Sequence, residues 1–474
     1  MFLSICWLLI PPQSLAGSTR SRISLPSVVS KALAKQGLPA DSLSVFVQES
    51  SNSRPLLNFG ARIPRNPAST IKLLTTFVAL DELGPTYTWK TEVYISGAIH
   101  EGLLDGDLII KGHGDPFLVT EYLWKLLRGL RDRGLRRIAG DLIVDNSYFE
   151  PQGKDTMVFD AKPYRTYNAT PDALLVNFQT IHFNFIPQTE LNGVRIIATP
   201  RPANLQIKNG LRLTRGPCRG RKYRMGMRVS QLESGVQVSF SGRYPFSCGS
   251  HIWNRVVFKP TDMLYGVFKT LWNDMGGTLD GRLRVGRRPE KAQLFYTHES
   301  RPLAELIRGM NKFSNNVMTR QLLLTLGAEQ IDAPGTEPKG IQIIMRWLKA
   351  HDLEFPELVI DNGAGLSRIT RISALSLGRF LLTTFASPYM PEFVSSMPLA
   401  GMDGTMKPRF RDGPLAGRLH AKTGSLKDVS ALAGFLLSRQ GRTYIVVIVQ
   451  NHPDLNRLAG QAIQDTLLQW VFEQ

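Results

Sequence analysis

The stretch NPASTIK at residues 66–72 decides the fold class, because it opens a predicted helix and carries the only S-x-x-K pattern in the chain. Pro67 suits the first turn of a helix and Gly84 suits its end, so we expect a helix from about Ser69 to the residue before Gly84. Positions i and i+3 share one face of a helix, so the Lys72 amine can reach the Ser69 hydroxyl and serve as its base. Taken alone the pattern is weak, because most such pairs are a surface Ser and Lys one turn apart.

Two further motifs follow along the chain. Ser314-Asn315-Asn316 is an S-x-N in a segment with helical periodicity, and residues 422–424 form the only K-T-G, on a predicted strand. A second S-x-N at residues 50–52 lies in a predicted hairpin turn, so this motif is also weak by itself. S-x-x-K at a helix start, S-x-N in a helical segment and K-T-G on a strand, in this order, form the triplet of serine enzymes that react with penicillin. The combination predicts an acyl-serine enzyme.

The predicted elements place these motifs in an α+β fold. Near the C-terminus, three strands precede a closing amphipathic helix: residues 420–424, 429–437, 443–450 and 455–472. Hairpin-linked strands packed by terminal helices imply an antiparallel sheet flanked by helices. Between the first two motifs, short strands punctuated by Gly and Pro predict a large β-rich insertion. We therefore predict a discontinuous catalytic domain, residues 17–89 plus 289–474, around an inserted unit, residues 90–288.

The N-terminus carries a pattern typical of export. Residues 2–10 are a short apolar run and residues 14–16 (SLA) end in a small-x-small pattern, which predicts a signal peptide at residues 1–16. No Lys or Arg precedes the run, so a start site placed too late or a buried first segment stays open. An exported chain can join Cys218 and Cys248 in one disulfide, with two buried free thiols as the alternative.

The charge balance limits the classes of partner. The formal net charge is +18, from 57 basic and 39 acidic residues. The basic residues are dispersed, with modest clusters at residues 215–228 and 282–288, and no nucleic-acid-binding module contains them, so we expect no nucleic acid. Anionic wall polymers or a membrane surface suit an exported basic protein better, and a merely solvated basic surface is the alternative. The chain has no CxxC or HExxH motif, and we expect neither metal nor cofactor.

From about residue 26 to the C-terminus the chain resembles the class C low-molecular-mass penicillin-binding proteins. These are D-alanyl-D-alanine carboxypeptidases/endopeptidases of the penicillin-binding protein 4 type. Besides the three motifs and the long block between the first two, the matches are residues 114–116 (GDP), 140–142 (GDL), 145–147 (DNS), 361–368 (DNGAGLSR) and 400–406 (AGMDGTM). The resemblance implies a penicillin-binding/β-lactamase-like transpeptidase domain, a periplasmic location, peptidoglycan peptides as substrates and acylation by β-lactam antibiotics.

The resemblance also implies catalytic roles. Ser69 would attack the carbonyl between the two D-alanines, Lys72 would take its proton, and Ser314 would relay a proton to the leaving amine. The backbone N–H groups of Ser69 and Ser425 would form the oxyanion hole.

Substrate-binding roles follow in the same way. Asn316 would hold the substrate amide, while Lys422 and Thr423 would bind its terminal carboxylate, with Ser425 beside them. In related enzymes an acidic residue of the inserted domain selects the substrate's side chain. Asp160 is the candidate by local position, and a solvated loop carboxylate is the alternative.

The sequence disfavours two other functions. A β-lactamase shares the acylation apparatus, but its common forms are much smaller and we identify no acidic deacylation residue between the first two motifs. A catalytically inactive wall-binding protein is disfavoured because the set of motif residues is complete. The sequence leaves open whether carboxypeptidase or endopeptidase activity dominates, and whether the protein forms a homodimer.

Overall fold

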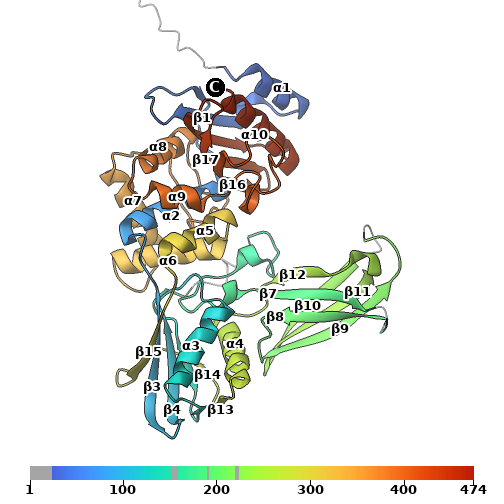
Figure 1. Cartoon of the computed structure of the whole chain (residues 1–474), viewed down its shortest axis with the longest axis vertical. Coiled ribbons are helices and arrows are strands. Elements are labelled where there is room, and N and C mark those ends of the chain that lie inside the picture. Colours follow the sequence, from blue (N-terminus) through green and yellow to red (C-terminus); the bar gives the residue numbers. More distant parts are fainter. Residues whose placement is uncertain (1–23, 152–158, 189, 191, 219–223) are drawn as a thin grey trace, which may run out of the picture.

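The computed structural model describes residues 24–151, 159–188, 190, 192–218 and 224–474. The predicted signal peptide at residues 1–16 lies outside the described residues. In Figure 1 the two ends of the chain fold together into an upper domain, and the middle of the chain forms the lower part and an arm at its side. Among the described residues, no helix is both long and apolar enough to span a bilayer.

A five-stranded sheet with the order β16-β17-β18-β1-β2 forms the centre of the upper domain. Its strands are β1 (Leu43–Glu49), β2 (Leu57–Phe59), β16 (Leu419–Leu426), β17 (Val429–Leu437) and β18 (Thr443–Asn451). Every neighbouring pair is antiparallel, which confirms the predicted sheet. Since β1 pairs with β18, the N-terminal segment completes a sheet begun at the other end of the chain.

Helices cover both faces of this sheet. On one face α1 (Ser27–Lys35) and α10 (Arg457–Phe472) pack over residues such as Leu432 and Val446. The adjacent residues Ala433 and Val447 point to the opposite face, because side chains alternate along a strand. That face is covered by α2 (Lys72–Leu83), α5 (Leu303–Lys312), α6 (Asn316–Gln330), α7 (Glu337–Ala350), α8 (Ala374–Phe385) and α9 (Met390–Ser396). Burial on both faces explains the nearly continuous apolar sequences of β17 and β18.

The inserted unit contains a seven-stranded mixed sheet with two helices, α3 (Thr120–Asp132) and α4 (Pro260–Asp274). The strands are β3 (Lys90–His100), β4 (Leu103–Gly112), β5 (Arg137–Ile138), β6 (Leu142–Asp145), β13 (Thr278–Leu279), β14 (Leu283–Val285) and β15 (Gln293–Glu299). Because β15 pairs with β3, this sheet extends past residue 288, where we predicted the insertion to end.

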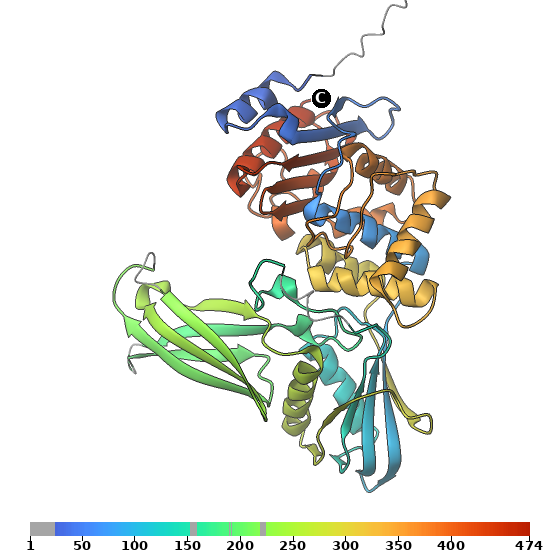
Figure 2. The same cartoon turned by 180° about the vertical axis from the view of Figure 1, so that it is seen from behind.

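Two three-stranded sheets pack face to face to form the arm, residues 181–255, which projects sideways in Figures 1 and 2. The sheet β12-β7-β8 contains β7 (Ile181–Gln188), β8 (Gly193–Thr199) and β12 (His251–Arg255). The sheet β10-β11-β9 contains β9 (Leu205–Thr214), β10 (Arg224–Leu232) and β11 (Gly235–Pro245). Phe183, Phe185 and Phe240 meet between the two sheets. The predicted disulfide between Cys218 and Cys248 is confirmed.

The chain enters and leaves the inserted unit through two adjacent segments. The Trp89 N–H donates to Ser300 Oγ at 2.9 Å, and the Ser300 N–H donates to the Trp89 carbonyl at 2.9 Å. The Leu303 N–H then donates to the Tyr87 carbonyl at 2.8 Å. The two connections therefore lie side by side although Trp89 and Ser300 are 211 positions apart in the sequence.

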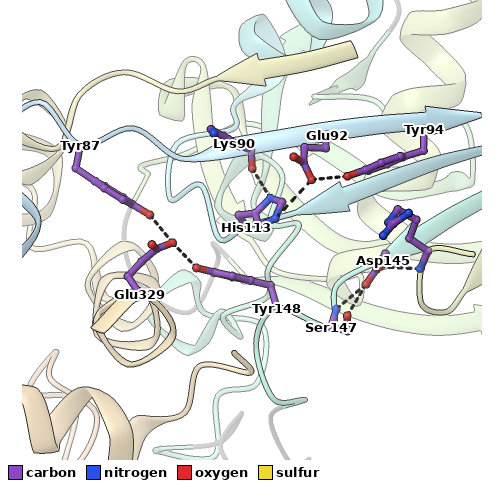
Figure 3. A network of polar contacts seen from close by, with 10 residues as sticks. Tyr87, Lys90, Glu92, Tyr94, His113, Asp145, Ser147, Tyr148 and Glu329 are labelled. Atoms are coloured by element: carbon purple, nitrogen blue, oxygen red, sulfur yellow. Dashed lines mark hydrogen bonds and ion pairs between the residues drawn. The ribbon is translucent and has the colours of Figure 1, made fainter. Parts of the chain in front are cut away.

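A polar network fixes the inserted unit against α6 (Figure 3). Glu329 of α6 accepts hydrogen bonds from the Tyr87 hydroxyl, at 3.0 Å, and from the Tyr148 hydroxyl. The His113 ring packs edge-on against Tyr148, and its Nε2 lies 3.6 Å from the Glu92 carboxylate. Burial and the nearby Glu329 carboxylate raise the pKa of both tyrosines, so their hydroxyls stay protonated and continue to donate.

Candidate active site

Ser69 and Lys72 occupy the start of α2. Ser69 lies in a 3₁₀ turn, Ala68–Ile71, and Lys72 is the first residue of the α-helix that follows. The Lys72 ammonium donates to Ser69 Oγ at 3.0 Å, to Asn316 Oδ1 at 2.7 Å and to the Ala364 carbonyl oxygen. An ammonium has three N–H donors, so these three acceptors account for all of them. When Lys72 loses a proton, its lone pair can face the Ser69 hydroxyl.

Burial sets the proton affinity of both active-site lysines. The Lys72 and Lys422 residues are 0% exposed. Burial lowers the pKa of Lys72 well below its usual value, and the positive charge of Lys422 lowers it further. Burial likewise lowers the pKa of Lys422 to about 7. A lysine with a lowered pKa can be a neutral amine near neutral pH, which is what a general base for a serine hydroxyl requires.

Ser314 lies in the turn between α5 and α6, and our prediction that this motif is helical holds only from Asn316 onward. Ser314 adopts a positive φ of 57°, and Asn315 caps α6 by accepting a hydrogen bond from the Met318 N–H. Lys422 Nζ donates to Ser314 Oγ at 2.9 Å. Backbone strain of this kind is frequent at functional sites. Here it directs the Ser314 hydroxyl toward Lys422 on the neighbouring strand.

The K-T-G motif lies on β16, a strand at the edge of the sheet. The side of β16 that does not pair with β17 faces Ser69. A Cβ on Gly424 would lie 2.7 Å from the Pro67 carbonyl oxygen and 3.1 Å from the Ser69 nitrogen. Only glycine therefore allows the strand to pass this close to the Ser69 turn. An edge strand leaves alternate backbone N–H groups unpaired. The approach brings the backbone leading to Ser425 against the Ser69 amide at the start of the helix.

A second set of contacts, which the sequence did not predict, supports Thr423. The Thr405 and Thr423 hydroxyls lie 2.8 Å apart. Thr405 follows Asp403, whose carboxylate accepts from Lys312 Nζ at 2.6 Å. A Cβ on Gly404 would lie 2.5 Å from the Lys312 carbonyl oxygen, so this loop packs directly on the end of α5. The AGMDGTM match thus joins the Ser314 turn to the K-T-G strand.

The DNGAGLSR match, residues 361–368, supports Lys72 in a similar way. Its Ala364 carbonyl accepts one of the Lys72 protons. Gly363 and Gly365 have φ values of 67° and 75°, and a Cβ on Gly365 would lie 2.0 Å from the Ala68 carbonyl oxygen. Glycine at these positions is what allows the loop to turn against the residue before Ser69.

The inserted unit also contributes to the site. The Tyr167 hydroxyl donates to Asp160 at 2.6 Å, and the Tyr167 carbonyl accepts from Asn316 Nδ2 at 3.4 Å. Asp160 is therefore connected through one residue to the catalytic cluster, which consists of Ser69, Lys72, Ser314, Asn316 and Lys422. A cavity of about 570 Å³ has Tyr167, Ser314 and Asn316 in its wall. Within the described ranges, no group of three His, Cys, Asp or Glu side chains could hold a metal ion.

Comparison with known proteins identifies relatives along almost the whole chain. Residues 25–474 match the D-Ala-D-Ala carboxypeptidase 3 (S13) family. The chain is 24% identical over 449 residues to the D-alanyl-D-alanine carboxypeptidase DacB of Haemophilus influenzae, covering 92% of this chain and 91% of that protein. It is 26% identical over 414 residues to a D-alanyl-D-alanine carboxypeptidase of an Actinomadura species, covering 85% of this chain and 76% of that protein.

Solved structures share the fold. The crystal structure of penicillin binding protein 4 from Haemophilus influenzae matches with a TM-score of 0.79 and 22% identity, covering 94% of this chain and 99% of that chain. A predatory endopeptidase from Bdellovibrio bacteriovorus matches with a TM-score of 0.55 and 16% identity, covering 90% of this chain and 92% of that chain. These likenesses confirm the predicted fold class. With the family match over nearly its full length, the chain belongs to the D-Ala-D-Ala carboxypeptidase 3 (S13) family of serine-type peptidases.

Proposed function

We propose that this D-Ala-D-Ala carboxypeptidase and DD-endopeptidase cuts peptidoglycan peptides through an acyl-enzyme formed on Ser69. The observation that carries the proposal is the contact between Ser69 Oγ and the buried Lys72 amine, at 3.0 Å. A serine hydroxyl is a weak nucleophile until a base accepts its proton, and burial gives Lys72 the lowered pKa that such a base needs.

The other contacts support a complete acylation and deacylation cycle. Lys72 takes the Ser69 proton as Ser69 Oγ bonds to the carbonyl carbon, and the N–H groups of Ser69 and Ser425 stabilise the oxyanion. Ser314, held by Lys422, passes its proton to the leaving amine as the C–N bond breaks, and the proton that Lys72 took from Ser69 restores Ser314, so Lys72 is a neutral amine again. Water then attacks the ester carbonyl and loses a proton to Lys72, and Lys72 returns that proton to Ser69 Oγ as the ester bond breaks.

Substrate recognition uses the facing strand and helix. The Thr423 hydroxyl and the Lys422 ammonium bind the terminal carboxylate, because an incoming anion favours the charged form of a buried lysine whose pKa is about 7. Asn316, already within reach of Lys72, holds the substrate amide. Ser425 extends this surface along β16.

We assign selection of the substrate's third residue to Asp160. Burial opposes its ionisation, but hydrogen bonds from Tyr167 and Asn168 outweigh burial, so the pKa of Asp160 is lowered and its carboxylate is charged. A charged carboxylate beside the site favours substrates with an amino group on that side chain. Lys162 Nζ, 3.7 Å from Asp160, competes with such a group.

Two further properties belong to the same proposal. The solved Haemophilus influenzae protein forms a complex with a β-lactam, and we expect β-lactams to acylate Ser69 in this chain. The apolar N-terminal run supports export to the periplasm, where peptidoglycan is accessible.

Intact mass after brief incubation with benzylpenicillin tests the mechanism, with Ser69→Ala as the matched control. We expect one stable adduct on the parent and none on the variant. An adduct that persists in Ser69→Ala would refute the assignment of the nucleophile. Rapid return to the unmodified mass with loss of the antibiotic would indicate a β-lactamase, and neither adduct nor turnover would indicate an inactive wall-binding protein.

A further inference from the structure

The outer face of the sheet β10-β11-β9 in the arm carries an unusual set of cations. Inward residues of β11, such as Val238 and Phe240, are buried, so the residues that alternate with them point to solvent. The same alternation along β9 and β10 defines the cationic face, whose cations with described side chains are Lys208, Arg212, Arg228 and Arg243. All four are exposed.

The strand register places these side chains close together. Arg228 and Lys208 flank Ser239 on its two neighbouring strands, which puts them roughly 10 Å apart, at two strand spacings. Arg212 and Arg243 are directly paired, four residues farther along, or about 13 Å away. These separations are close to the Debye length of about 8–10 Å at physiological salt, so the fields of the four charges add.

No anion balances this face. The outward positions of the three strands contain no Asp or Glu, and in the part of the chain that the structure describes none of the four cations forms an ion pair. Elsewhere the protein does pair its arginines, for example Arg137 with Asp280 and Arg409 with Asp465. Like charges on neighbouring strands destabilise a sheet. The direct pairing of Arg212 with Arg243 therefore points to a function for the positive charge.

We propose that the cationic face binds the surface of a membrane that contains anionic phospholipids. The residues between the cations are Ser239, Ser241, Gly210 and Gly226, so the face is shallow and has no walls to hold a single chain. A linear polymer can follow one row of cations. A planar array of phosphate groups reaches both rows at once, and basic residues near such a surface add their binding energies.

This surface lies in the arm, separate from the catalytic cluster, and the inference does not depend on the proposed mechanism. It assigns the arm a tethering role: the enzyme would be held beside the membrane through an exposed sheet while the upper domain stays free to act on the wall. Each cation removed should weaken binding about fivefold, the equivalent of about 1 kcal/mol for each basic residue at an anionic surface.

Vesicle sedimentation tests the proposal with the full chain. The vesicles contain phosphatidylglycerol and phosphatidylcholine, or phosphatidylcholine alone. The face variant combines four substitutions: Lys208→Gln, Arg212→Gln, Arg228→Gln and Arg243→Gln. The control variant loses the same charge from exposed residues outside the arm: Lys31→Gln, Lys35→Gln, Arg54→Gln and Arg457→Gln. Release of D-alanine from a soluble peptide should be unchanged in both variants, which verifies that they fold.

We expect the parent and the control variant to sediment with the anionic vesicles, and the face variant to lose at least 100-fold in affinity. About 0.5 M salt should release the parent. Equal losses in the two variants would show that net charge alone is responsible and would overturn the proposal. Equal binding to phosphatidylcholine would also overturn it, as would binding of soluble polyphosphate at the cationic face without binding to vesicles.

Discussion

Replacing Thr405 with Val removes a hydroxyl that contacts Thr423 at 2.8 Å and changes little else in shape. A hydroxyl has one proton to donate. When Thr423 donates to the substrate carboxylate, the proton shared by the two threonines must come from Thr405. Thr405→Val therefore leaves the Thr423 hydroxyl free to rotate away from the substrate, and Thr405→Ser should preserve its orientation.

The size of the effect follows from the strength of a neutral hydrogen bond. Such a bond contributes about 0.5–1.5 kcal/mol, which corresponds to about two- to tenfold in binding. We expect KM for a peptide ending in D-Ala-D-Ala to rise by this factor in Thr405→Val, with kcat nearly unchanged. Thr405→Ser should stay close to the parent. Thr383→Val, at a helical hydroxyl that bonds only to its own helix, serves as the matched control.

The assay is D-alanine release, compared between a peptide with a free terminal carboxylate and the same peptide with a terminal amide. Because the proposed effect acts through the carboxylate, Thr405→Val should weaken only the first substrate. The double variant with Thr423→Val should lose little more than Thr423→Val alone. Equal losses for both peptides, or strictly additive losses in the double variant, would refute the positioning of Thr423 by Thr405.

Three further predictions concern the same site. Gly424→Ala places a Cβ 2.7 Å from the Pro67 carbonyl oxygen, so the rate of penicillin acylation should fall more than tenfold and the free energy of unfolding should fall by about 1–3 kcal/mol. Acylation kinetics and thermal unfolding measure these two quantities. Neither should change in the control Gly413→Ala, where a Cβ meets nothing within 4 Å. Burial lowers the pKa of Lys422 to about 7, so between pH 8 and 9 the unfolded chain binds more protons than the folded chain. The free energy of unfolding should therefore rise over this range by about 1.4 kcal/mol per pH unit from this group. Denaturant titrations should show a smaller dependence of the free energy of unfolding on pH in Lys422→Met, and an unchanged dependence would contradict the lowered pKa of Lys422 as its cause. Asp160→Asn should lower kcat/KM for peptides with an amino group at the third side chain and spare neutral ones, whereas equal losses would indicate a structural role.

Much of the catalytic cluster could be predicted from sequence, because its residues belong to motifs that are recognised by their side-chain types and spacing. S-x-x-K and K-T-G each occur once, and a helix brings Ser69 and Lys72 together through local geometry alone. The supporting contacts were less accessible. The Ala364 carbonyl has no sequence signature, since every residue has one. Thr405 meets Thr423 only after the chain has folded, and neither spacing nor periodicity reports that contact.

The fold, too, was predictable where a local pattern determines it and less so where distant segments must meet. Continuous apolar runs predicted β17 and β18, because a strand between two covered faces is apolar on both sides. The end of the inserted unit was harder to place, because β15 finds its partner β3 far back along the chain. The positive φ of Ser314 also depends on tertiary contacts: Asn315 must cap α6 while Lys422 holds the preceding hydroxyl.

The side-by-side connections at Trp89 and Ser300 have a consequence for the history and engineering of this enzyme. Since the chain leaves and returns at one place, the whole inserted unit behaves as a cassette: a link of a few residues could bridge the gap without rerouting any other part of the catalytic domain. Recombination could therefore exchange this cassette in a single event. Under the roles proposed for Asp160 and the cationic face, changes in the cassette would alter which peptides are accepted and whether the enzyme binds a membrane, while Ser69 remains in place.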